Sequence, residues 1–142
     1  YLQYRASIMT EGEFLKALCQ QTGCEILLDV NNAYVNQLNH GIDAREFIRS
    51  LPAQHIREIH LAGFEDKGGY LIDAHNNRVA DAVWELYEYL VDTHGETVTL
   101  IEWDNDIPSF EVLAGEARHA QQIQDSSVKE SDRKNCQRAG DG

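Results

Sequence analysis

The sequence predicts an α/β fold in which parallel strands are flanked by helices. Short apolar runs of strand length alternate along the chain with amphipathic stretches of helical spacing, in the order helix, strand, helix, strand, helix, strand, helix. This alternation is typical of parallel sheets with crossover helices. A doubly wound sheet and a (β/α)8 barrel both fit the pattern, but a complete barrel needs about 250 residues. The chain has 142 residues, so its length allows only part of a barrel.

The first helix is predicted to begin at residues 10–13, Thr-Glu-Gly-Glu, which form a capping box for the amides of the first turn. Apolar residues at helical spacing follow, and Gly23 ends the helix. Residues 24–30 form a short apolar run that predicts a buried strand. A second, short helix is predicted between its cap, Asp43, and Pro52, which closes it.

A second strand is predicted over 56–62, and a loop that contains glycines follows it over 63–72. The longest helix is predicted over 77–93, with Asn77 as its cap, because its apolar residues recur at helical spacing. A third strand is predicted over 97–104. The order of these elements completes the alternation.

The last predicted helix opens at Pro108 and Ser109, and the composition changes soon afterwards. Residues 124–142 hold four basic and four acidic side chains and almost nothing apolar. Such a segment buries too little surface to offset the entropy lost when it is ordered. We therefore expect two regions, a partial barrel domain over 1–123 and a disordered polar tail over 124–142.

Charge and composition exclude several classes of partner. Lys and Arg number 12 against 24 Asp and Glu, and the formal net charge of −12 disfavours nucleic acid and anionic membrane surfaces. No run of about 18 apolar residues predicts a membrane span. The three cysteines show no C-x-x-C spacing, so neither a disulfide framework nor a thiolate zinc site is expected. A cytoplasmic location fits this cysteine usage best.

Polar side chains that can bind a metal ion follow the predicted strands at their carboxyl ends, which is where α/β folds place their sites. Side chains alternate along a strand, so Asp29 and Asn31 are expected to face the same way. Asp73 and His75 do the same if their segment is extended. The converging set is predicted to contain Asp29, Asn31, His60, Asp73, His75 and Glu102, with His40 after a loop bounded by glycine.

A metal site explains this set better than packing does. Carboxylates are costly to place in apolar strands unless they are paired or bound to a metal. His60 alone fits a core histidine with satisfied hydrogen bonds, but helix capping does not account for Glu102 in the middle of a strand. Oxygen-rich sites with a few imidazoles suit Mn or Fe, and thiolate-rich sites suit Zn.

Five short motifs resemble those of one known family. Over about residues 1–123 they occur in order: LLDVNN at 27–32, NHG at 39–41, EIHLAG at 58–63, IDAH at 72–75 and LIEWD at 100–104, followed by IP at 107–108. In these motifs the chain resembles the DUF692, or UPF0276, family. These are multinuclear non-heme iron-dependent oxidative enzymes, related to the methanobactin and 3-thiaglutamate biosynthesis proteins.

The resemblance implies a (β/α)8 barrel like that of xylose isomerase, of which this chain would be the C-terminal half. It implies two or three non-heme iron ions that activate dioxygen to oxidise cysteine in a ribosomally synthesised precursor peptide, and it allows a peptide-recruiting partner protein. Two further histidines and a Glu-Asn segment would belong before residue 1. By the same resemblance the metal ligands in this chain are Asp29, Asn31, His40, His60, Asp73, His75 and Glu102.

Two other interpretations stay open at the level of the sequence. A divalent-metal isomerase or a phosphodiesterase-like barrel would use the same carboxylates and imidazoles, with Mn or another divalent metal, to polarise a sugar or a phosphate. The chain has no glycine-rich phosphate loop or basic cluster to support that interpretation. The second of these interpretations is that the chain is a truncated, non-catalytic fragment. Whether the chain binds metal would distinguish such a fragment from the two kinds of enzyme.

Overall fold

A three-stranded sheet forms the centre of the protein, in the strand order β1-β2-β5. The computed structural model describes residues 6–140, and their side chains as far as residue 129. The strands are β1 (Ile26–Asp29), β2 (Ile56–Leu61) and β5 (Val98–Ile101). Both strand pairings are parallel, which confirms the predicted α/β class with a parallel sheet.

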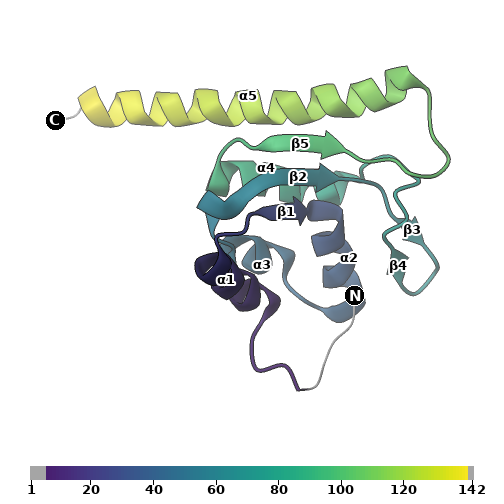
Figure 1. Ribbon diagram of the computed structural model, residues 1–142. Helices are drawn as coiled ribbons and strands as arrows, with labels where there is room; N and C mark the ends of the chain where they lie inside the picture. The colour runs from purple at the N-terminus through teal and green to yellow at the C-terminus, as the bar shows by residue number, and fades with distance from the viewer. Residues whose placement is uncertain (1–5, 141–142) are drawn as a thin grey trace.

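The register of the sheet brings the carboxyl ends of its strands to one edge (Figure 1). Asp29, the last residue of β1, is paired with His60 of β2. His60 is in turn paired with Leu100 of β5. Parallel neighbours need a crossover connection, because the chain must return to the same end of the sheet before each new strand. Helices take part in both crossovers, so every strand delivers its last residues to the same place.

The described residues, 6–140, form five helices. They are α1 (Glu11–Thr22), α2 (Val30–His40), α3 (Ala44–Ser50), α4 (Asp81–His94) and α5 (Phe110–Gly140), with a 3-10 turn over Ala53–His55. Helices α2, α3 and α4 pack against one another, α1 packs on α3, and α5 lies along β5 and α4 (Figure 1). Within residues 6–140, no helix combines the length and the apolar character that crossing a membrane requires.

Two of the predicted helix caps form as the sequence indicates. The Thr10 hydroxyl accepts from the amide of Glu13, and the Glu13 carboxylate accepts from the Thr10 amide at 2.8 Å, which completes the capping box. Gly23 ends the same helix in the left-handed conformation, with φ 71°. The Asp43 carboxylate accepts from the Glu46 amide at 2.9 Å and caps α3. These contacts are local, which is why the sequence predicts them.

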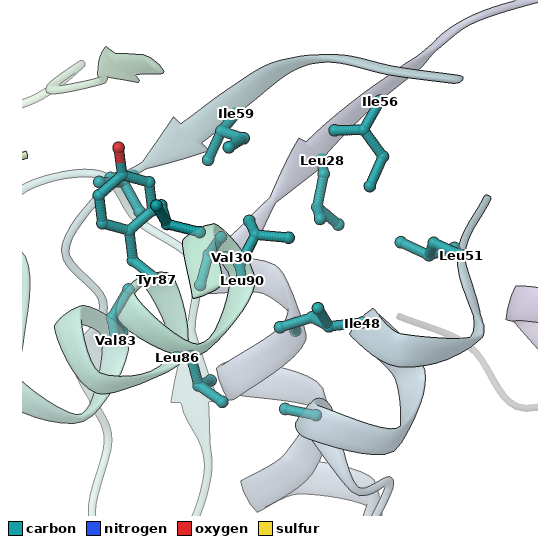
Figure 2. Packing of buried hydrophobic residues seen from close by; sticks show 14 of the residues in the cluster. Leu28, Val30, Ile48, Leu51, Ile56, Ile59, Val83, Leu86, Tyr87 and Leu90 are labelled. Atoms are coloured by element: carbon teal, nitrogen blue, oxygen red, sulfur yellow. The ribbon is translucent and has the colours of Figure 1, made fainter. Parts of the chain in front are cut away.

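The core lies between the sheet and helices α3 and α4. Figure 2 shows Leu28 and Ile59 from the strands facing Ile48 of α3 and Tyr87 and Leu90 of α4. None of these five side chains is more than 4% exposed. Complete burial of one apolar side chain contributes about 1.5–3 kcal/mol relative to leaving it in water. This layer is therefore the main stabilising contact of the fold.

The other face of the sheet is open to solvent. Leu27 of β1 and Val98 and Leu100 of β5 are 53%, 73% and 44% exposed. Leu27 is paired with Glu58 of β2 and Leu100 with His60, so these two polar side chains lie on the same face. We call the surface formed by Leu27, Glu58, His60, Val98 and Leu100 the open face.

Residues 30–40 form helix α2, where the sequence predicts the end of a strand and a loop. The helix begins directly after β1 because the Asp29 carboxylate caps it, accepting a hydrogen bond of 2.8 Å from the amide of Asn32. Valine and asparagine are weak helix formers, so the sequence carries little signal for this helix. Gly41, at φ 70°, ends it in the left-handed conformation.

The segment between β2 and α4 also differs from the prediction. An antiparallel hairpin, β3 (Glu65–Asp66) and β4 (Leu71–Ile72), occupies the predicted loop and lies beyond the carboxyl ends of the sheet strands (Figure 1). Helix α4 begins at Asp81, and Asn77 does not cap it. The side-chain amide of Asn77 donates instead to the carbonyl of Phe64. This contact anchors the irregular stretch before α4 to the end of β2.

Helix α5 continues to Gly140, across most of the stretch for which the composition predicts a disordered tail. Gln124 donates to the Thr97 carbonyl at 2.9 Å, and Ser127 donates to Asp92 at 2.8 Å. The stretch has no proline, and its Gln, Glu, Lys and Arg residues favour helix. The prediction from composition considers only how little apolar surface the stretch can bury, and it ignores the helix propensity of these residues. The final two residues of the predicted tail lie outside the described residues.

Gly63 joins the end of β2 to the hairpin at a point with no room for a side chain. A Cβ at this position would lie 2.2 Å from the backbone oxygen of Asn77 and 2.6 Å from that of Arg78. The Gly63 carbonyl also accepts a hydrogen bond of 3.0 Å from the amide of His75. The close approach at this glycine therefore determines how the following segment returns to the sheet.

We expect Gly63→Ala to lower the free energy of unfolding by about 1–3 kcal/mol, because the added methyl group must displace backbone atoms. Gly69→Ala is the matched control, since a Cβ there meets nothing within 4 Å, and it should change stability by less than about 1 kcal/mol. Urea unfolding of both variants measures the difference. Equal effects of the two substitutions would contradict the steric argument.

Candidate metal centre

Six of the seven predicted ligand residues come together at the carboxyl ends of the sheet strands. They come from the end of β1, the first turn of α2, the end of β2, the irregular segment after the hairpin and the residue that follows β5. We refer to these residues as the cluster: Asp29, Asn31, His60, Asp73, His75 and Glu102.

Asp73 is the hydrogen-bond acceptor for one side of the cluster. Its two carboxylate oxygens accept from the side-chain amides of Asn31 and Asn32, the second at 2.6 Å. Asn31 is completely buried in the first turn of α2. The sequence predicts that Asn31 shares a strand face with Asp29. The chain reaches the same place differently, by turning into a helix directly after Asp29.

His75 has a left-handed backbone, with φ 48°, so the extended conformation that is the condition for Asp73 and His75 to face the same way is not met at this residue. Its amide donates to the Gly63 carbonyl at 3.0 Å, and its carbonyl accepts from the amides of Asp104 and Asn105 at 2.8 and 3.3 Å. Such a conformation costs a residue other than glycine about 1–3 kcal/mol and persists only where the surroundings over-determine it. The fold therefore holds the His75 imidazole where the local chain alone would not place it.

The two imidazoles of the cluster share the carboxylate of Glu102. His60 Nδ1 lies 2.8 Å from Glu102 Oε2, and His75 Nδ1 lies 3.4 Å from the same oxygen. On the other side of its ring, His75 Nε2 lies 2.9 Å from Asp73 Oδ1 and 3.8 Å from Asp29 Oδ2. His75 is thus at the centre of the cluster, with carboxylates on both sides of its ring.

Asp29, His75 and Glu102 each offer one ligand atom, and these three atoms lie within 4.8 Å of one another. Two carboxylate oxygens and an imidazole nitrogen at this separation can close on a divalent cation through small movements of the side chains. A donor set of oxygens and imidazole suits Mn or Fe, whereas thiolates suit structural Zn. The cluster is therefore a possible Asp/His/Glu metal site.

Burial and charge raise the proton affinity of the cluster. Burial raises the pKa of Asp29 above its ordinary 3.8; the Asn32 amide opposes this rise, and the charge of Asp73 adds to it. Burial lowers the pKa of His75, but the three neighbouring carboxylates outweigh it, so the pKa rises above its ordinary 6.5. Both groups therefore bind their protons more tightly in the folded, metal-free protein than in the unfolded chain. Their contribution to the free energy of unfolding is complete below the ordinary pKa of each group and is lost as the pH rises through the raised pKa of the folded state. A divalent cation would neutralise the same carboxylates in place of the protons.

Two buried polar atoms of the cluster lack a hydrogen-bond partner. In the part of the chain whose side chains are described, Asn31 Oδ1 and His75 Nδ1 are both buried and unpaired. Oxygens of Glu102 and Asp104 lie 3.4 and 3.3 Å from His75 Nδ1 but are out of line for a hydrogen bond. An unsatisfied buried group costs about 1–3 kcal/mol. Because a cation accepts both amide oxygens and imidazole nitrogens as ligands, the residues present fit a bound metal ion.

The structure does not bring His40 to the cluster. His40 is the last residue of α2, and a helix rising 1.5 Å per residue separates it from Asn31 by roughly 14 Å. No hydrogen bond or ion pair described for residues 6–129 joins it to the cluster. The neighbouring Asn39 has a structural role, because its side-chain amide makes two hydrogen bonds of 2.8 Å with the backbone of Leu71 and ties α2 to the hairpin.

Three residues beside the cluster are not among the predicted ligands. The side-chain amide of Asn32 lies 2.6 Å from the Asp73 carboxylate. The Asp104 carboxylate lies 3.3 Å from His75 Nδ1, and the Glu58 carboxylate lies 3.2 Å from His60 Nε2. Strand alternation is the signal that finds Glu58 and Asp104, since each is two positions from a predicted ligand. Asn32 carries no such signal, because its position depends on a helix that the sequence does not predict.

We expect Asp73→Ala to lower the free energy of unfolding of the metal-free protein by about 1–3 kcal/mol, because the Asn31 and Asn32 amides lose their acceptor. Relief of the repulsion between Asp73 and Asp29 partly opposes this loss. Asp66→Ala is the matched control, because the exposed Asp66 carboxylate accepts a hydrogen bond only within the hairpin. Urea unfolding in the presence of a chelator measures both variants, and a smaller effect at Asp73 than at Asp66 would contradict this network.

Known proteins resemble the chain over most of its length. The family model described as "RiPP precursor modification enzyme MbnB/TglH/ChrH" matches residues 1–125. A UPF0276 protein of Acaryochloris marina is 48% identical over 120 residues, which cover 84% of this chain and 44% of that protein. A UPF0276 protein of Anaeromyxobacter sp. is 46% identical, and the match covers 90% of this chain and 45% of that protein. A UPF0276 protein of Rhizobium meliloti is 42% identical, and the match covers 88% of this chain and 42% of that protein.

The chain thus spans less than half the length of these curated relatives and corresponds to their C-terminal part. The stretch matched by the family model, residues 1–125, contains every residue of the cluster. On this match and these identities, the chain belongs to the MbnB/TglH/ChrH family of RiPP precursor modification enzymes, whose relatives compared above are UPF0276 proteins.

Proposed function

We propose that this chain supplies part of the metal centre of an iron-dependent oxidative enzyme that modifies cysteine in a ribosomally synthesised precursor peptide. The observation that carries the proposal is the convergence of Asp29, His75 and Glu102 within 4.8 Å of one another. Membership of a family of precursor modification enzymes supports a peptide substrate. The resemblance of the motifs to those of non-heme iron enzymes supports iron and dioxygen.

The proposed ligands are the six residues of the cluster. Three carboxylates, two imidazoles and the unpaired amide oxygen of Asn31 form an oxygen-rich set that suits Fe or Mn. The set is large for a single ion, and by resemblance we propose two or three iron ions. We leave His40 out of the set, because α2 holds it apart from the other residues.

We further propose that the three strands belong to a (β/α)8 barrel of the xylose isomerase kind. The open face, on which Leu27, Val98 and Leu100 are exposed, is the surface that the interior of a barrel would enclose. The chain spans less than half the length of its relatives, so further strands are available in proteins of that length. Those strands would also bring further metal ligands to the same end of the barrel.

The residues of this chain hold the ligand atoms in place before a metal binds. Asp73 accepts from Asn31 and contacts His75 Nε2, so one carboxylate orients an amide and an imidazole. Glu102 lies between the two imidazoles on the other side. Such supporting contacts fix ligand orientation and reduce the rearrangement that binding requires. Iron, when bound, would supply the binding and reduction of dioxygen that the oxidation of a thiol needs.

The hairpin gives the proposed peptide a place to approach the cluster. It follows β2 in the chain and lies beyond the carboxyl ends of the sheet strands (Figure 1). Asp73 of the cluster comes directly after β4. Tyr70, at its tip, is 57% exposed, and Ile72 is 39% exposed. We propose that the precursor peptide passes over this hairpin, alone or presented by a peptide-recruiting partner protein.

We expect Fe(II) or Mn(II) to raise the melting temperature of the purified protein. A ligand that binds only the folded state stabilises it by mass action, by about 2.7 kcal/mol at one hundred times the Kd. Glu102→Gln should weaken this effect and lower the iron content, because a neutral amide is a poorer ligand for a hard cation. Thermal unfolding with metal against chelator, together with metal analysis, measures both.

Glu85→Gln, on the exposed side of α4, is the matched control and should retain metal binding. If metal leaves the melting temperature of the wild-type protein unchanged, the cluster is not a metal site. That result would favour the interpretation of the chain as a non-catalytic fragment.

Dioxygen dependence tests the reaction class. We expect the iron-loaded protein to consume dioxygen in the presence of a cysteine-containing precursor peptide and to change the mass of that peptide, whereas Cys→Ser peptides should stay unchanged. Oxygen electrode measurements and mass spectrometry of the peptide are the readouts. Turnover of a sugar or a phosphate ester with Mn and without dioxygen would favour the isomerase or phosphodiesterase interpretation instead.

A further inference from the structure

Glu58 contacts the side of the His60 ring that faces away from Glu102. Glu58 Oε1 lies 3.2 Å from His60 Nε2, and Glu102 Oε2 lies 2.8 Å from His60 Nδ1. The His60 side chain is only 13% exposed, whereas that of Glu58 is 43% exposed. The imidazole is therefore held between two carboxylates, of which only Glu102 also contacts the second imidazole of the cluster.

Glu58 is half-exposed on the open face of the sheet, and its described polar contact is with His60. Glu58 is paired in register with Leu27 on one side and Val98 on the other, so it sits in an apolar row of the open face. The hydrogen bond described for its carboxylate goes to His60. Water reaches the Glu58 carboxylate, so burial does not force this contact; it follows from the alternation of the strand, which places the His60 imidazole two positions along on the same face.

A neutral imidazole has one N–H and one lone pair, so fixing the proton on one nitrogen presents the lone pair at the other. We propose that Glu58 is a positioning residue: it accepts Nε2–H from His60 and so presents the Nδ1 lone pair to the cluster. The inference rests on the proposed function, in which His60 is a metal ligand. Histidines that bind metals generally donate their second N–H to a carboxylate or carbonyl in this way.

Glu102 cannot take over this role once a metal is bound. Its carboxylate is one of the three groups whose ligand atoms lie within 4.8 Å of one another, so a cation in the cluster engages it. In the metal-free protein Glu102 is also the competitor, because it would accept the proton if this were on His60 Nδ1. With metal present, Glu58 is thus the carboxylate that stays free to accept the second N–H of His60.

The tautomer can be measured directly, without metal and without activity. In the metal-free full chain, at a pH where the imidazole is neutral, ¹⁵N NMR of the histidine ring should show His60 protonated at Nε2, with His60→Ala assigning the signals. Glu58→Gln keeps an acceptor oxygen and should keep this tautomer. Glu58→Ala should move the proton toward Nδ1 and Glu102. A wild-type protein already protonated at Nδ1 would overturn the proposal, whether or not the variants fold.

Metal affinity is the second readout. We expect Glu58→Ala to weaken Mn(II) binding by about tenfold, at the lower end of the effect of removing such a supporting carboxylate, and Glu58→Gln to restore most of the affinity. Glu25→Gln is the matched control, because Glu25 pairs with the exposed Arg57 outside the cluster. Unchanged affinity in Glu58→Ala overturns the positioning role. If the wild-type protein binds no Mn(II), the proposed function fails, and the tautomer measurement alone still decides the role of Glu58.

Discussion

The crowding of carboxylates at one edge of the sheet is the constraint on which the rest of the structure depends. Asp29, Asp73 and Glu102 all lie within 4 Å of the His75 ring, and their charges repel one another unless something compensates. Amides from the first turn of α2 and the imidazoles supply the compensation that the chain itself contains. Two departures from a plain alternation of strands and helices adjoin this edge: the immediate start of α2 after β1 and the hairpin that follows β2.

Two different kinds of contact stabilise the molecule, one in the apolar core and the other at the carboxyl ends of the strands. Beneath the sheet, apolar side chains such as Leu28, Ile59 and Tyr87 are buried among helices, and this packing tolerates many combinations of residues of similar volume. At the carboxyl ends, backbone hydrogen bonds determine the positions instead. Gly63 admits a backbone approach that no other residue allows, and His75 is forced into a left-handed conformation. The apolar layer offsets the strain that the polar end retains.

This division explains what the sequence predicts and what it does not. Strands, capping residues and the face of each strand depend on local pattern, so the parallel sheet and the polar strand ends are predictable. Asn31 reaches the cluster through a helix of weak propensity, and hydrogen bonds to segments distant in sequence position His75. The sequence pattern therefore does not predict how these two residues are placed. The same unpredicted helix separates His40 from the other residues. Local pattern identifies chemistry well, but tertiary hydrogen bonds decide which residues meet.

Three independent costs coincide at the cluster, and their coincidence is itself an argument about its purpose. The backbone of His75 is strained, Asn31 Oδ1 is buried without a partner, and carboxylates are held close together. A polar network that served stability alone would satisfy its buried groups, because a partly satisfied network is less stable than an apolar one. One change would offset two of these costs together: a cation between the carboxylates neutralises their charge and accepts the unpaired amide oxygen as a ligand. The strain at His75 would remain, and it holds the imidazole where that same cation needs a nitrogen ligand.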